Sequence, residues 1–221
     1  GPAASVAGAL LYLKVTNGIF VEVGGTSTNI CIIKNGKPEI RYATIKDHPT
    51  CIRSMDVRIL GVAGGSMIKL KDNRVWNVGP RSAHIAGMRY SCFADATTLK
   101  QGKIIQIKPK QSDSEPYVAI QCQNETFAIT NTCAANALGL IDKDDYSFAD
   151  QTAAKIAMEL LGKEIGISGP EVAMSIIQTA SFEITKTVSK ILKEFKMDKL
   201  KTQIIGGGGG ASVLVPFVAK Q

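Results

Sequence analysis

The sequence contains few of the side chains from which metal centres and disulfide frameworks are built. Its 221 residues include five cysteines, none in a CxxC pair, and two histidines, His48 and His84. An odd, dispersed set of cysteines argues against a disulfide scaffold or a zinc site and favours a reducing, cytoplasmic location. With only two histidines, a His-rich metal centre or a His-based catalytic triad is not expected. We interpret Cys92, Cys133 and His84 as ordinary structural residues.

Aromatic side chains and long apolar runs are also scarce. Aromatic residues make up 6% of the chain, with a single Trp, which argues against a large aromatic platform for a ligand. No apolar run approaches the roughly 20 residues that cross a bilayer. The first residues lack the basic start of a signal peptide. We therefore expect no membrane partner.

The net charge of +7 comes largely from lysines concentrated at residues 100–110 and 186–201. In the second run Ile191, Leu192 and Phe195 alternate with the lysines at helical spacing. We interpret these lysines as the solvated face of an amphipathic helix. The run has no interleaved aromatics and matches no nucleic-acid-binding motif, so no nucleic-acid partner is expected.

The first half of the chain reads as strands. Residues 17–23, 29–35 and 38–45 alternate or run apolar, and Asn35-Gly36 between the last two is a strong hairpin signal. A second hairpin is predicted around Asp72-Asn73. A short helix, with Gly1-Pro2 suited to its first turn, is expected before the first strand.

From Thr130 onward the pattern changes to helices. Ser168-Gly169-Pro170-Glu171 combines a capping box with an early proline, and a 3.6-residue apolar period then continues to Phe195. A short strand at 202–205, the five glycines 206–210 and a helix starting at Pro216 complete the chain. This order predicts an α/β fold in one domain, residues 1–221, with antiparallel hairpins towards the N-terminus and helices packed on a mixed sheet.

Two glycine loops are candidates for binding an anion. Glycine allows positive φ and a close approach of a ligand to backbone N–H groups, and successive N–H groups form an anion-binding nest. Taken alone, the first loop could equally be a polar hairpin and the second a flexible linker. A glycine run between a strand and a helix, however, is a typical nucleotide-binding arrangement. The residues of the two loops are Gly24, Gly25, Thr26, Ser27 and Thr28, and Gly206, Gly207 and Gly208.

Three further features adjoin these loops. Glu22 precedes the first loop by two residues, where a carboxylate could hold Mg²⁺ or orient an attacking water. A third cluster, Gly64-Gly65-Ser66, is either a ligand-facing turn or a bulged strand junction. Arg81 could clamp an anion.

The order of these motifs resembles a known family. Residues 1–9, 21–29 (VEVGGTSTN), 56–68 (DVRILGVAGGSMI), 78–87 (VGPRSAHIAG) and 204–211 (IIGGGGGA) are similar to the second half of the A-type subunit of the hydantoinase/5-oxoprolinase family. Members resemble the actin, sugar-kinase and heat-shock-chaperone ATPases, which have two ribonuclease-H-like domains with ATP and Mg²⁺ between them. The resemblance implies that this chain is the second of these lobes and that the first lobe is a partner missing from it.

The same resemblance implies a function and roles for particular residues. Gly24-Gly25-Thr26 matches a phosphate loop and Gly206-Gly207-Gly208 the adenosine side, with Glu22 and Thr26 as catalytic candidates and Glu22 as the metal ligand. The expected activity is ATP-dependent opening of a small cyclic amide such as a hydantoin or 5-oxoproline. A second subunit or another copy of the chain are further candidate partners.

The chain departs from the family's pattern at three positions. Glu22, Asn29 and Asn131 stand where the family typically has aspartate, and each change lengthens or neutralises a carboxylate. Two alternatives therefore stay open: a sugar- or acid-kinase-like ATPase, and a degenerate domain used for assembly or regulation. We expect the isolated chain to be inactive.

Overall fold

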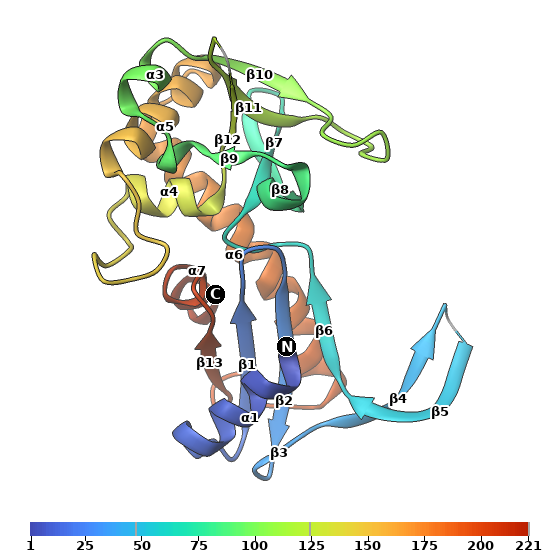
Figure 1. The fold of residues 1–221 in the computed structure, drawn as a ribbon. Helices are drawn as coiled ribbons and strands as arrows, with labels where there is room; N and C mark the ends of the chain where they lie inside the picture. Colours follow the sequence, from blue (N-terminus) through green and yellow to red (C-terminus); the bar gives the residue numbers. More distant parts are fainter. Residues whose placement is uncertain (47, 124, 221) are drawn as a thin grey trace.

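In the computed structural model, residues 1–46, 48–123 and 125–220 are described (Figure 1). A five-stranded mixed sheet forms one end of the molecule. Its strands are β1 (Gly18–Val23), β2 (Thr28–Lys34), β3 (Lys37–Pro38), β6 (Val57–Leu60) and β13 (Gln203–Gly207). Strand β13 is parallel to β1, and the other pairs are antiparallel. The order β13-β1-β2-β3, with β6 also on β2, places the two predicted glycine loops beside each other.

The two faces of this sheet are covered differently because side chains alternate along β1. Helix α1 (Pro2–Leu13) covers the face that carries Phe20 and Cys31. The opposite face, with Val21 and Val23, joins the main hydrophobic core, to which α6 (Gly169–Glu194) and α7 (Ala211–Ala219) contribute.

A four-stranded sheet lies at the other end of the molecule. Its order is β10-β11-β12-β9, formed by β9 (Arg89–Tyr90), β10 (Lys103–Ile107), β11 (Tyr117–Gln121) and β12 (Thr126–Ala128). The hairpin of β7 (Ser66–Lys71) and β8 (Arg74–Ser82) lies beside it. The neighbouring helical segments are α2 (Ala83–Ala86), the 3₁₀ turn η1 (Ser91–Phe93), α3 (Ala96–Lys100), α4 (Asn131–Ala137) and α5 (Gln151–Ile165).

Helix α6 connects the two ends, running past both sheets (Figure 1). Its predicted start is confirmed: Ser168 and Glu171 form the reciprocal capping box. The predicted apolar stripe is confirmed as well, because Val172, Ile176, Ala180, Ile184 and Val188 are buried. Among the described residues, no helix has both the length and the apolar character needed to span a membrane.

The cap of α6 gives a first test of the fold. Ser168→Ala removes the acceptor for the Glu171 N–H and is expected to lower the free energy of unfolding by about 1 kcal/mol. Ser189→Ala, at an exposed position of the same helix, should change the free energy of unfolding by only a few tenths of a kcal/mol, because alanine is the better helix former. Urea unfolding measures both, and an equal loss in the two variants would contradict the capping role.

The mixed α/β fold class is confirmed, and so are both hairpin turns. Asn35 and Gly36, and likewise Asp72 and Asn73, have positive φ, as two-residue hairpin turns require. The strands nevertheless divide among two larger sheets and two hairpins.

Two local predictions differ from the structure. The predicted strand 38–45 stays beside β2 only at Pro38, which pairs with Ile33, and at Glu39, whose N–H donates to Ile32 O at 2.9 Å. Beyond that point β4 (Ile40–Ile45) pairs with β5 (His48–Met55) in a hairpin that projects from the body (Figure 1). The last helix begins at Ala211 and contains Pro216 internally. The helix starts earlier than predicted because Ala211, Val213 and Leu214 are buried in the core. Pro216 has no N–H for the helical carbonyl four residues before it. Pro216 is exposed, so water can bond to that carbonyl instead.

Candidate functional site

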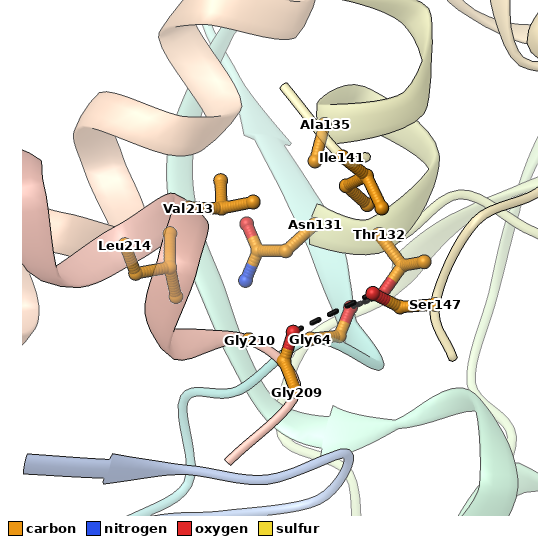
Figure 2. Close-up of a pocket in the computed structure, with 10 residues that line it drawn as sticks. All are labelled: Gly64, Asn131, Thr132, Ala135, Ile141, Ser147, Gly209, Gly210, Val213 and Leu214. Atoms are coloured by element: carbon orange, nitrogen blue, oxygen red, sulfur yellow. Dashed lines mark hydrogen bonds between the residues drawn. The ribbon is translucent and has the colours of Figure 1, made fainter. Parts of the chain in front are cut away.

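Six segments from distant parts of the chain line one cavity of about 530 Å³. They are the β1–β2 turn, the β6–β7 turn, the start of α4, the glycine run before α7, the segment of β9 and η1, and the loop between α4 and α5. The lining residues are Gly24, Gly25, Gly64, Tyr90, Phe93, Thr132, Tyr146, Ser147, Gly209 and Gly210. A smaller cavity of about 10 Å³ shares five of these, Gly64, Thr132, Ser147, Gly209 and Gly210, and adds Asn131 (Figure 2).

Backbone hydrogen bonds hold the first three segments together. Gly64 N–H donates to Gly24 O at 3.0 Å, and Gly65 N–H donates to Gly25 O at 2.8 Å. The start of α4 joins them, because Thr132 donates to Gly64 O through its N–H at 2.8 Å and its hydroxyl at 3.0 Å. Of the predicted third cluster, Gly64 therefore lies at the cavity and Gly65 directly behind it.

The turn after β1 presents free backbone donors. Gly24 N–H closes the turn onto Ser27 O at 3.1 Å. The N–H groups of Gly25, Thr26 and Ser27 make no hydrogen bond within the part of the chain that the structure describes. Three successive unpaired N–H groups are the arrangement that binds anions through the backbone.

The glycine run before α7 reaches the same cavity through residues that follow the predicted ones. Gly206 and Gly207 lie within β13, beside Val21 and Glu22, and the ring of Phe20 fills the space where a Cβ on Gly207 would lie. Gly208 has φ +83° and turns the chain. Gly209 and Gly210 then line the cavity, directly after the predicted Gly206–Gly208 set.

The family model for hydantoinase/oxoprolinase matches residues 1–221. The chain belongs to the hydantoinase/oxoprolinase family. It is 24% identical over 225 residues to the caprolactamase subunit alpha of Pseudomonas jessenii, covering 100% of this chain and 29% of that protein.

Two solved structures have a similar fold. A nucleotide-free acetone carboxylase, from work on ATP-dependent acetone carboxylation, gives a TM-score of 0.70 at 17% identity, over 100% of this chain and 28% of the other. The ATP-dependent caprolactamase from Pseudomonas jessenii gives 0.60 at 22%, over 99% and 28%. The chain thus spans less than a third of the length of each of these proteins.

In this hydantoinase/oxoprolinase chain, Glu22 lies on the sheet face that α1 covers. Ser5 of α1 donates to Glu22 Oε1, and Asn29, directly opposite on β2, donates through Nδ2 to Oε2 at 2.9 Å. The carboxylate is not among the groups lining the cavity. Within residues 1–46, 48–123 and 125–220, no three or more His, Cys, Asp or Glu side chains are grouped to hold a metal.

Several predicted hydroxyl residues have structural partners. Thr28 is buried and donates to Val62 O. Buried Ser66 accepts from Ala63 N–H at 2.8 Å. The side chains of Thr26 and Ser27 make no hydrogen bond with the described residues, and neither residue lines the cavity. Among the described residues, the hydroxyls of Thr26 and Ser27 are therefore as free of partners as the backbone N–H groups of the same turn, whereas those of Thr28 and Ser66 are used within the fold.

Other singled-out residues lie away from the cavity lining. Arg81 is paired with Asp113, and its Nε–Oδ1 distance is 3.0 Å. That carboxylate, by hydrogen bonding, raises the pKa of the Arg81 guanidinium. Cys92 and Cys133 are buried in the core, as predicted.

Sequence reasoning missed the aromatic and α4 residues of the site. Tyr90 ends the two-residue strand β9, Phe93 ends η1, and Tyr146 and Ser147 lie in the loop before α5. None of them belongs to a motif that the sequence displays. Thr132 could have been suspected from the sequence, because it lies in the first turn of a helix that Thr130 caps through its side chain. The N-terminus of a helix favours an anion.

Asn131 adds an unusual group beside the cavity. It is 2% exposed, and its Nδ2 donates to Ala63 O at 2.7 Å. Its Oδ1 is the one buried side-chain N or O atom without a hydrogen-bond partner among the described residues. Figure 2 draws this amide between α4 and the segment that leads into α7.

Proposed function

We propose that the chain forms the nucleotide-binding part of an ATP-dependent enzyme that opens cyclic amides. The observation that carries the proposal is the set of free N–H groups at Gly25, Thr26 and Ser27, in the turn whose Gly24 and Gly25 line the cavity. Such a set suits a phosphate, which needs several donors in a small space. The structurally similar caprolactamase and acetone carboxylase, both ATP-dependent, support the choice of ATP.

The cavity residues fit a phosphate-bearing ligand better than a metal. Glycine turns at Gly24-Gly25, Gly64 and Gly209-Gly210 allow close approach to the backbone. When bound, ATP would supply the phosphoryl group that activates an amide oxygen and so exposes the ring carbon to water. The residues of this chain would bind and orient the phosphates.

Magnesium is a prediction that these residues alone do not support. The predicted ligand, Glu22, is hydrogen-bonded to Ser5 and Asn29 on the face that α1 covers. We therefore assign no step to a protein-bound metal. We propose that any Mg²⁺ enters with the ATP phosphates, which hold it together with water.

The rest of the proposed enzyme lies outside this chain. The chain spans 28–29% of its relatives, and we propose that a further lobe, together with a second subunit or another copy of the chain, completes the active site. The substrate class we favour is a small lactam, hydantoin or 5-oxoproline ring. The related caprolactamase, whose name denotes a lactam substrate, supports a cyclic amide.

Gly25→Val in the parent protein tests the nucleotide site. A Cβ at Gly25 would meet only the Tyr90 hydroxyl, 3.9 Å away, so the variant should fold while its methyl groups enter the cavity. The methyl groups would keep the phosphate away from the backbone N–H groups. We expect ATP affinity, measured by calorimetry, to fall about 100-fold, because the loss of several charge-assisted hydrogen bonds costs roughly 3 kcal/mol. Gly207→Val is a poor probe because its Cβ would lie 2.7 Å from the Phe20 ring.

Gly8→Val is the matched control. Gly8 has nothing within 4 Å of its Cβ position and lies in α1, and ATP affinity should stay unchanged. Absence of ATP affinity in the unmodified parent protein would refute the proposal. Product analysis separates the reactions: a ring-opened acid with ADP and phosphate supports the amide hydrolase, whereas a phosphorylated substrate would favour a kinase.

A further inference from the structure

The phenol group of Tyr90 meets the two glycine turns at the cavity. Tyr90 ends β9, and its ring packs against Phe93 with the centroids 6.0 Å apart. Its hydroxyl lies 3.9 Å from the Cβ position of Gly25 and occupies the space where a Cβ on Gly65 would lie. The ring is thus held by its neighbours while the hydroxyl is directed at the junction of the turns.

This hydroxyl makes no hydrogen bond within the described residues. It adjoins the turn whose Gly25, Thr26 and Ser27 N–H groups are also free. A phenol beside unpaired backbone donors adds a further donor, held by its packed ring, to a turn that offers mainly its N–H groups to the cavity. The group that satisfies all of them must accept several hydrogen bonds in a small volume, as a phosphate does.

We infer that the Tyr90 hydroxyl donates a hydrogen bond to the phosphate held by the Gly25–Ser27 N–H groups. The inference rests on the proposed function and adds a specific ligand-binding side chain to it. Gly65 has a matching role, because any larger residue there would displace the hydroxyl and press on Gly25 O, 2.6 Å from its Cβ position.

The ionisation of Tyr90 is compatible with this role. Burial, with smaller contributions from Cys133 and Cys92, raises the pKa of Tyr90 above that of an ordinary tyrosine. The side chain therefore keeps its proton at neutral pH and acts as a donor to an anion.

Tyr90→Phe in the parent protein tests the inference. The change removes one oxygen and keeps the ring against Phe93, so the melting temperature of the ligand-free protein should be nearly unchanged. We expect calorimetry to give an ATP affinity about 10-fold to 100-fold weaker, as for loss of a hydrogen bond to a charged group. Tyr12→Phe removes the same atom from an exposed residue of α1 and should leave ATP affinity unchanged.

The outcomes separate this inference from the function on which it rests. An unmodified parent protein without ATP affinity would overturn both. Normal ATP binding in the parent with equal affinity in Tyr90→Phe would overturn the Tyr90 role alone. Equal ATP affinity combined with a raised KM for the cyclic amide would also overturn it, because the hydroxyl would then contact substrate. An equal loss of ATP affinity in Tyr12→Phe would also overturn the Tyr90 role, because the effect would then not depend on the position of the hydroxyl.

Discussion

Gly208→Val is expected to lower the free energy of unfolding by about 3 kcal/mol or more. Gly208 has φ +83°, a conformation that costs a β-branched residue roughly 1–3 kcal/mol. Its Cβ would also lie 2.5 Å from Val23 O and 3.0 Å from Val23 C. These are backbone atoms of the central strand β1 and cannot move aside without disturbing the sheet.

Gly209→Val is the matched control for this prediction. Gly209 follows directly, has no positive φ, and has nothing within 4 Å of its Cβ position, so its free energy of unfolding should change by no more than about 0.5 kcal/mol. Urea unfolding followed by circular dichroism compares the two variants. Equal stability of the two would show that Gly208 is not required for the turn between β13 and α7.

Local signals in the sequence were sufficient for most of the individual elements. Asn35-Gly36 and Asp72-Asn73 have the side chains that two-residue turns need, and Ser168 and Glu171 form a cap from residues three apart. Each of these depends on neighbours in the chain, which is why composition and spacing identify them. The position of Pro216 was misread because tertiary packing of α7 outweighs its local preference.

The candidate site depended on contacts that no local pattern contains. Gly24 and Gly64 are joined by one backbone hydrogen bond, and Gly64 and Thr132 by two. Backbone groups carry no residue-specific signal, so the sequence could mark each turn as glycine-rich without indicating which turns meet. The aromatic wall of the cavity was missed for a related reason, since Tyr90 is positioned by the pairing of β9 with β12.

The structure also gives a physical reason for two of the departures from aspartate. Asn29 donates to the Glu22 carboxylate, and Asn131 donates to Ala63 O. An ionised aspartate cannot donate at either position. At position 29 an aspartate would also place a second negative charge opposite Glu22. The glutamate at position 22 and the asparagine at position 29 therefore fit each other as a hydrogen-bonded pair.

Asn131→Asp is therefore expected to destabilise the protein, by about 3 kcal/mol or more at neutral pH. The side chain is 2% exposed, and the change would direct a carboxylate oxygen at Ala63 O without a compensating partner, a situation that costs several kcal/mol. Asn73→Asp, at an exposed turn position with φ +53°, makes the same chemical change and should alter stability little.

The pH dependence distinguishes a buried charge from a mere loss of packing. Burial would raise the pKa of the new aspartate above its unfolded value of about 3.9. A protonated acid can again donate to Ala63 O, so the stability deficit should be smallest below about pH 4 and grow as pH rises through the raised folded pKa. Urea unfolding across this range measures the effect. A deficit independent of pH would contradict it. Recovery of stability with Mg·ATP at neutral pH would also contradict it, because the new carboxylate would then bind a cation at the proposed nucleotide site.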